Sequence, residues 1–118
     1  MITRIVGVTF NNDETGENRQ DIISELKQKK QLIFGQEVEL TREPGNQYDG
    51  NAIAVIGPDH RKLGYIKREI SAEFAPLMDN GAKTRAFVRH LLGDGEDYFY
   101  GIEIALGIIE ESEPAEEK

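Results

Sequence analysis

Short apolar segments rich in β-branched residues recur along this chain, and each one ends at a cluster of glycine, proline, asparagine or aspartate. Alternation of apolar and polar residues over a short stretch is typical of a strand with one buried face, and such turn residues end strands. The AIAVIG run at 52–57 is continuously apolar, as a buried strand would be. The pattern predicts strands at residues 2–10, 37–42, 52–57, 63–66, 83–92 and 98–109.

Two further segments have helical spacing. Asn18 can cap a helix that runs from Arg19 to about Lys30, with Asp21 in the first turn, where the helix dipole favours an acid. Apolar residues between positions 70 and 78 also recur at helical intervals. Pro76 lies among them and removes an interior hydrogen bond, so we expect it to divide or kink this second helix.

Six short strands and two helices favour one mainly β domain, a six-stranded antiparallel barrel of the OB-like or SH3-like kind. A closed barrel leaves no exposed strand edges, and 118 residues suit a single core. A flat α+β sheet with both helices on one face remains the alternative. We expect this domain to span residues 1–109 and to be followed by an acidic disordered tail at 110–118, where five glutamates stand against one lysine.

Charge and cysteine content limit the function. The formal net charge of −8 is unusual for a protein that binds nucleic acid, because contacts of Lys and Arg with phosphates dominate such affinity. Residues 61–90, however, hold seven Lys or Arg against three acids, so one face is expected to be basic. The absence of cysteine excludes disulfides, thiolate catalysis and Cys-ligated metals.

No pattern of catalytic residues stands out, so we expect a non-enzymatic protein that needs no cofactor and no metal. The GDGED turn at 93–97 lacks the ligand spacing of a calcium loop, and His60 and His90 have no patterned partners. There is no phosphate-binding P-loop and no serine in a nucleophile elbow. Neither a membrane span nor a signal peptide is visible, which predicts a cytoplasmic protein without a membrane partner.

Two long motifs carry a resemblance to a known family. They are VELTREPGNQYDGNAIAV at 38–55 and LGYIKREISAEFAPLMDNG at 63–81, preceded by the opening VGVTF at 6–10. Together they resemble a HIRAN domain over nearly the whole of residues 1–109, and in particular the stand-alone bacterial form. Other members are fused to nucleases or to DNA-dependent ATPases that remodel stalled replication forks.

The resemblance implies an OB-like barrel whose pocket holds single-stranded DNA by its 3′ end, in DNA repair or replication-fork processing, with a DNA-processing protein as a further partner. A pocket for a strand end needs an acceptor for the 3′-hydroxyl, aromatic faces for stacking and donors for phosphates. In the loop after the second strand, Asp49 is the candidate acceptor, Tyr48 the stacking or phosphate-binding group, and Asn46 a partner for a base edge or backbone oxygen. The same residue types also suit a tight turn.

Other candidate residues lie on neighbouring segments. In GYIKRE the resemblance favours Tyr65 and Arg68 at the phosphates, whereas strict alternation along a strand would put Tyr65 and Lys67 on one face. We therefore keep both Lys67 and Arg68 as phosphate contacts. Arg42 is equally suited to a phosphate contact and to structural pairing.

Phe10 and Tyr98 match positions where the family places stacking aromatics, although both are also suited to a core. In ATPase-fused members the first strand ends in an arginine followed by aromatics, but this chain has Thr9, Phe10 and Asn11. The resemblance thus implies one phosphate contact fewer here. The competing hypothesis is a protein-interaction adaptor that uses the same barrel groove, in keeping with the negative net charge. A small metal-dependent nuclease is a third, for which GDGED is poor support.

Overall fold

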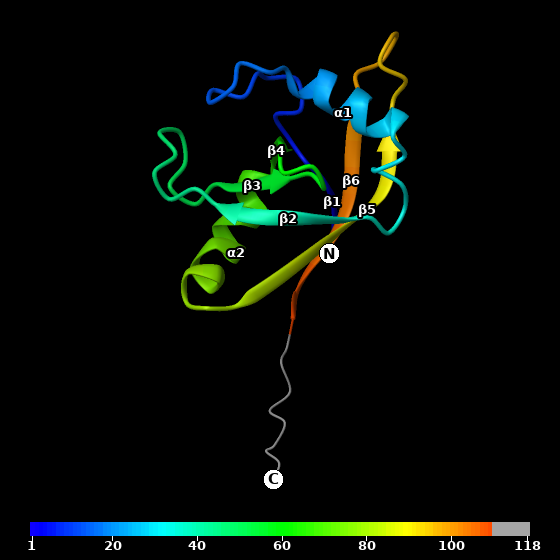
Figure 1. Ribbon diagram of the computed structural model, residues 1–118. Coiled ribbons are helices and arrows are strands. Elements are labelled where there is room, and N and C mark those ends of the chain that lie inside the picture. The colour runs from blue at the N-terminus through cyan, green and yellow to red at the C-terminus, as the bar shows by residue number, and fades with distance from the viewer. Residues whose placement is uncertain (110–118) are drawn as a thin grey trace.

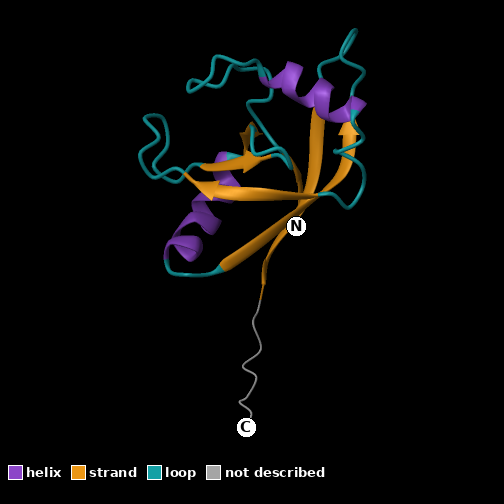
Figure 2. Ribbon diagram, in the orientation of Figure 1, coloured by secondary structure: helices purple, strands orange, loops and turns teal. Residues whose placement is uncertain are grey.

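The computed structural model describes residues 1–109, which form six strands and two helices (Figures 1 and 2). In chain order they are β1 (Ile2–Arg4), α1 (Arg19–Gln28), β2 (Glu37–Arg42), β3 (Ile53–Ile56), β4 (Lys62–Tyr65), α2 (Arg68–Asp79), β5 (Lys83–Leu92) and β6 (Gly101–Ile109). The predicted acidic tail, residues 110–118, lies outside the described residues.

The strands form one antiparallel sheet in the order β1-β6-β5-β2-β3-β4, and this sheet curls into a half-barrel. Two consecutive residues after β1, Ile5 and Val6, link the two edges of the sheet. Ile5 donates its N–H to the carbonyl of Ile102 in β6 at 3.0 Å, whereas Val6 exchanges both backbone hydrogen bonds with Tyr65 in β4, at 2.8 and 2.9 Å. The predicted six-stranded antiparallel barrel with two helices is thus confirmed in a half-barrel form, and the flat-sheet alternative is wrong.

Both helices pack apolar side chains onto the sheet. Asn18 caps α1 by accepting from the Gln20 N–H at 2.9 Å, and Ile22, Ile23 and Leu26 are buried beneath the helix. Figure 1 shows α1 across the upper ends of β5 and β6, with α2 below β2 and β3. The core includes residues from both helices and from all the longer strands, with Ile53, Val55, Leu63, Val88, Ile102 and Ile104 among its most buried members.

Two predicted strand boundaries were wrong, and so was the predicted division of the second helix. The first strand ends at Arg4 and not at Phe10, because Gly7 has a φ of +72° and the chain turns there, with Phe10 donating to the Gly7 carbonyl. The last strand begins at Gly101 and not at Tyr98. Pro76 does not divide α2, because it lies in the last turn of the helix with an exposed ring and removes only one hydrogen bond.

Within the part of the chain that the structure describes, neither helix is long and apolar enough to cross a bilayer.

Candidate functional site

A cavity of about 810 Å³ opens between three segments that are distant in sequence. They are the segment that follows β1, the loop between β2 and β3, and the junction between β4 and α2. Of the predicted site residues, this cavity brings together Phe10, Asn46, Tyr48, Asp49, Tyr65 and Arg68. It does not include Arg42, Lys67 or Tyr98. Its remaining wall consists of Val6, Gly7, Asn11, Asp13, Arg19, Ala52 and Ile66.

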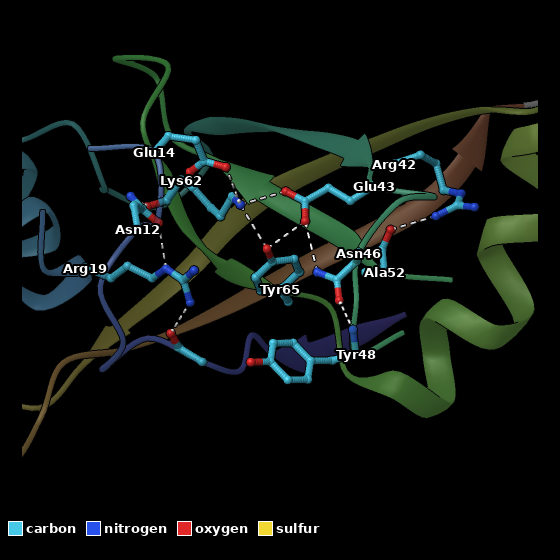
Figure 3. Close-up of polar contacts among 11 residues, drawn as sticks. Asn12, Glu14, Arg19, Arg42, Glu43, Asn46, Tyr48, Ala52, Lys62 and Tyr65 are labelled. Carbon is cyan, nitrogen blue, oxygen red and sulfur yellow. Dashed lines mark hydrogen bonds and ion pairs between the residues drawn. The ribbon is translucent and has the colours of Figure 1, made fainter. Parts of the chain in front are cut away.

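The β2–β3 loop is held in shape by its own side chains. Asn46 accepts hydrogen bonds from the backbone N–H groups of Tyr48 and Asp49, at 2.8 and 3.1 Å. Asp49 in turn accepts from the Asn51 N–H at 2.9 Å through Oδ1, which leaves Oδ2 facing Arg68. Figure 3 shows the Asn46 side chain directed at the Tyr48 backbone N–H. Asn46 and Asp49 therefore stabilise the turn, as their residue types predict. Their hydrogen bonds fix the loop that carries Tyr48 and Asp49 at the cavity.

The junction between β4 and α2 places Lys67 and Arg68 differently relative to the cavity. β4 ends at Tyr65 and α2 begins at Arg68, so strand alternation does not extend to these cations. Tyr65 and Arg68 both line the cavity, whereas Lys67 is exposed and is not part of the cavity wall. Arg68 donates to the Tyr48 carbonyl at 2.6 Å, and its Nε lies 3.5 Å from Asp49 Oδ2. Arg68 is thus a solvent-exposed cation at the mouth of the cavity.

A polar network around its hydroxyl group holds the Tyr65 ring in place. Its hydroxyl donates to Glu43 Oε1 at 2.7 Å and accepts from Lys62 Nζ at 2.8 Å, and Lys62 also pairs with Glu43 Oε2 at 2.6 Å (Figure 3). Burial and the nearby Glu43 carboxylate raise the pKa of Tyr65 despite the Lys62 hydrogen bond. The phenol therefore stays protonated, and Tyr65 forms a rigid wall of the cavity.

Two exposed aromatic rings line the cavity. The Phe10 side chain is 67% exposed and Tyr48 is 78% exposed, although large apolar rings usually gain by burial. Tyr98 is similarly exposed, at 73%, but it lies on the loop between β5 and β6, away from the cavity wall. The rings of Phe10 and Tyr48 are thus placed to contact a ligand in the cavity, and the ring of Tyr98 is not.

Arg42 has a structural position. Its side chain is 13% exposed, pairs with Asp79 of α2 at 2.9 and 3.0 Å, and donates to the carbonyls of Ala52 and Gly50 at 2.8 and 3.0 Å. The Arg42 hydrogen bonds hold the pKa of Asp79 below its ordinary value. Of the two predicted roles of Arg42, the structure therefore shows the structural pairing, because its donors are occupied and it lies outside the cavity.

Several of the basic residues between 61 and 90 have acidic partners in the folded chain. Each of several cations in this stretch is paired with acids from other elements, which cancels much of its charge locally. Arg61 contacts Glu17 at 2.9 Å, Asp59 at 2.6 Å and also Glu25. Arg85 pairs with Glu37 at 2.9 Å, and Arg89 lies 3.5 Å from Glu103. Sequence distance does not reveal partners that the fold brings close, so the basic face stays a prediction.

Sequence reasoning missed Arg19, which reaches the cavity wall from the first turn of α1. Its position at the start of the predicted helix could have indicated a functional role. A cation in the first turn of a helix is opposed by the positive end of the helix dipole, so its presence there indicates a role other than helix formation.

Metal-ligating side chains do not cluster in the part of the chain that the structure describes. Within residues 1–109, no group of three His, Asp or Glu side chains is placed to hold a metal ion. In the GDGED turn, Asp94 accepts from the backbone N–H groups of Glu96 and Tyr98 at 2.9 and 3.1 Å. Those bonds hold the pKa of Asp94 below its ordinary value, and they make this carboxylate part of the turn.

Comparison with known proteins identifies the family. A family model described as the HIRAN domain matches residues 4–91. The chain belongs to the HIRAN family. A crystal structure of a protein from Lactobacillus plantarum is similar to this HIRAN chain at 34% identity and a TM-score of 0.63, covering 89% of this chain and 90% of that one. The crystal structure of the HIRAN domain of human HLTF shares the fold at 22% identity and a TM-score of 0.59. The match covers 88% of this chain and 71% of that one.

Curated relatives match over shorter segments. The helicase-like transcription factor of Mus musculus is 54% identical over 43 residues, which is 36% of this chain and 4% of that protein. The Fanconi-associated nuclease 1 homolog of Arabidopsis thaliana is 43% identical over 49 residues, 42% of this chain and 6% of that protein. This chain therefore spans only a small part of the length of these relatives.

Proposed function

We propose that this HIRAN chain is a DNA-binding module that captures the 3′ end of single-stranded DNA in the cavity beside Tyr48. The observation that carries the proposal is the convergence of Phe10, Tyr48, Asp49 and Arg68 on one cavity of about 810 Å³. That volume lies within the range of roughly 300 to 1,000 Å³ that is usual for small-ligand sites. The same cavity therefore offers stacking faces, a carboxylate acceptor and a cation.

Each of these groups suits one part of a strand end. A base can stack on an exposed aromatic ring, and such stacking contributes roughly 1 to 3 kcal/mol per base. Asp49 Oδ2 faces the cavity mouth, where it can accept a hydrogen bond from a 3′-hydroxyl. Arg68 is exposed, and its planar guanidinium can donate two hydrogen bonds to phosphate oxygens in a geometry that a lysine lacks.

The relatives support a DNA-processing context. They include a helicase-like transcription factor and a Fanconi-associated nuclease homolog, although the HIRAN segment is a small fraction of each. We propose that this chain contributes binding without catalysis, since its cavity groups are suited to recognition and Tyr65 is held protonated. A role in DNA repair or in processing of replication forks, alongside a DNA-processing protein, follows from this proposal.

Fluorescence anisotropy with short labelled single strands tests the proposal. The strands carry either a free 3′-hydroxyl or a 3′-blocked end, and the protein is the intact chain, its Asp49→Ala variant or its Asp97→Ala variant. Asp97 lies in the β5–β6 turn outside the cavity, so Asp97→Ala changes the net charge equally. We expect a preference for the free end that Asp49→Ala loses and Asp97→Ala keeps.

Two results would overturn the proposal. Equal affinity for free and blocked ends would reject end capture and leave general strand binding. Absence of binding to either strand would reject DNA binding and favour the adaptor hypothesis, in which the same cavity takes a segment of another protein.

A further inference from the structure

Arg19 is a buried cation whose hydrogen-bond partners are all neutral. Its residue is 6% exposed, its Nε donates to Asn12 Oδ1 at 2.8 Å, and its Nη1 donates to the Gly7 carbonyl at 2.7 Å (Figure 3). Within residues 1–109, Nη2 makes no hydrogen bond, and no carboxylate forms an ion pair with this guanidinium. Arg19 also belongs to the wall of the cavity. This residue of the cavity wall therefore keeps one guanidinium nitrogen without a hydrogen-bond partner among residues 1–109.

Such an arrangement is costly unless an anion joins it. A buried charge is stabilised when an opposite charge pairs with it, and it is expensive when only neutral groups surround it. The other partly buried arginines of residues 1–109 lie next to acids: Arg42 pairs with Asp79, Arg61 pairs with three acids, and Arg89 lies 3.5 Å from Glu103. Arg19 departs from this rule, although it is the most buried of the four.

The remaining charges of the cavity do not neutralise Arg19. Asp49 lies against Arg68, whose Nε is 3.5 Å from its Oδ2. Asp13 lines the cavity but is exposed and forms no ion pair with Arg19. The first turn of α1 adds a partial positive charge near Arg19, which favours an anion at the same place. Charge complementarity therefore indicates an anionic group of the ligand.

The surroundings hold the guanidinium in one orientation. Its central carbon lies 5.2 Å from the centre of the Tyr65 ring, within the range of a cation–π contact. A Cβ at Gly7, whose φ is +72°, would lie 3.2 Å from Nη1, so the glycine leaves room for this donor. Asn12, which is itself buried, is anchored by its donation to the Lys62 carbonyl at 3.1 Å. The site is thus built from three elements before any ligand arrives.

We propose that Arg19 is an anion receptor on the inner wall of the cavity, separate from Arg68, and that it binds a phosphate group of the ligand. The inference rests on the proposed function, because the bound DNA strand would supply that phosphate as a backbone phosphodiester. Free inorganic phosphate has the same chemistry, so the test must distinguish the two sources. Arg68 at the cavity mouth and Arg19 within it would then contact different phosphates of one strand.

The test combines a variant series with a measurement on the unaltered chain. Arg19→Gln removes the charge, Arg19→Lys keeps the charge but loses the planar fork, and Lys29→Gln is the control, an exposed lysine at the C-terminal end of the same helix. Affinity for a single strand is measured against salt concentration. We expect Arg19→Gln to bind about tenfold or more weakly, as the loss of a charge-assisted hydrogen bond implies. Its salt slope should fall by about 0.7, the value for one phosphate contact on a single strand.

Because Arg19→Gln also loses bonds that shape the Gly7 turn, a second measurement does not depend on its folding. The Nε–Hε resonance of Arg19 in the intact chain, assigned by its absence in Arg19→Lys, is followed by NMR during addition of the single strand or of inorganic phosphate alone. We expect the strand to shift this resonance. A strand with a neutral methylphosphonate in place of the contacted phosphodiester should not.

The outcomes separate the two proposals. A strand that binds in an Asp49-dependent manner, with an unmoved Arg19 resonance and equal affinities of Arg19→Gln and Lys29→Gln, would overturn the Arg19 assignment alone. A chain that binds no strand but whose Arg19 resonance shifts with inorganic phosphate would overturn DNA capture and support an anion receptor for a free phosphate compound. Absence of strand binding, together with an Arg19 resonance that neither addition shifts, would overturn both proposals.

Discussion

Arg68 donates its guanidinium hydrogen to the backbone carbonyl of Tyr48 at 2.6 Å, and so ties the first residue of α2 to the tip of the β2–β3 loop. Because the contact is made to the backbone, the Tyr48 ring remains 78% exposed above the cavity. The loop is thereby positioned without use of the side chain that would contact a ligand. The Tyr48 ring is therefore exposed on a backbone that is fixed at the cavity, whereas the Tyr98 ring is exposed outside the cavity.

The first prediction uses that distinction. Tyr48→Ala removes a ring from the cavity wall and should weaken binding of single-stranded DNA by roughly 1 to 3 kcal/mol, the contribution of one base stacked on an aromatic ring. Tyr98→Ala removes an equally exposed ring from the β5–β6 loop and should change affinity less than twofold, within about 0.4 kcal/mol. Anisotropy titrations of both variants with one labelled strand make the comparison. Equal losses in the two variants would show that Tyr48 has no special role.

The second prediction separates two arginines that the sequence alone does not distinguish. Arg42→Gln should lower the free energy of unfolding by about 1 to 2 kcal/mol, because the Ala52 and Gly50 carbonyls lose a donor. DNA affinity at a temperature where the variant is folded should remain near that of the unaltered chain. Arg68→Gln should weaken DNA binding and leave the free energy of unfolding nearly unchanged, since Arg68 is exposed and lines the cavity. Urea unfolding and DNA titration of both variants give the two readouts, and weaker DNA binding by folded Arg42→Gln would argue for a phosphate contact there.

Local patterns predicted most of the fold. Alternation of apolar residues and turn chemistry located β2, β3, β4 and β5 to within a residue or two, and the Asn18 cap located the start of α1. These signals are local, because a strand's buried face and a helix cap depend on neighbouring residues. The closure of the sheet also followed from the number of short strands, although the pairing that achieves it, Val6 with Tyr65, left no local pattern.

Contacts between distant residues explain the failures. Arg42 is paired with Asp79, 37 positions away, and Arg85 with Glu37, 48 positions away, so the sequence alone did not show which cations have acidic partners. The cavity was predicted where residue types and motif agreed, at Asn46, Tyr48, Asp49 and Tyr65. Arg19 was missed because it lies on a helix that the motif does not include, and only the fold brings it to the Tyr65 ring.

A third prediction concerns acid stability. Burial of Glu43 alone raises its pKa, but hydrogen bonds from Lys62, Tyr65 and Asn46 outweigh burial and hold the pKa below its ordinary value of 4.5. A carboxyl whose pKa is lower in the folded state than in the unfolded state stabilises the fold above its ordinary pKa, and this stabilisation is lost as the pH falls through the folded-state pKa. Urea unfolding from about pH 7 to about pH 3 should therefore show a shallower loss of stability for Glu43→Gln than for the unaltered chain.

Other acids titrate in the same range, so a control is needed for Glu43→Gln. Glu37→Gln removes a carboxyl whose pKa is lowered mainly by its hydrogen bond to Arg85 at the surface, away from the cavity. If both variants flatten the pH dependence equally, the Tyr65 network contributes nothing beyond a surface ion pair. A larger effect for Glu43→Gln would identify this network as the main acid-sensitive contact near the cavity.

The last prediction concerns closure of the half-barrel at Gly64. A Cβ there would lie 2.5 Å from the Val6 carbonyl oxygen, which accepts the Tyr65 N–H, and 3.3 Å from side-chain atoms of Ile5 and Val8. Backbone cannot yield as a flexible side chain can, so Gly64→Ala should part Val6 from β4 and lower the free energy of unfolding by about 2 to 3 kcal/mol. Gly107→Ala in β6 is the control, because a Cβ at that position meets nothing within 4 Å and should change stability by no more than about 0.5 kcal/mol. Since Val6 and Gly7 also line the cavity, the Gly64→Ala variant should lose DNA affinity even where it remains folded. Undiminished stability in both variants would show that the Val6–Tyr65 pair does not hold the two sheet edges together.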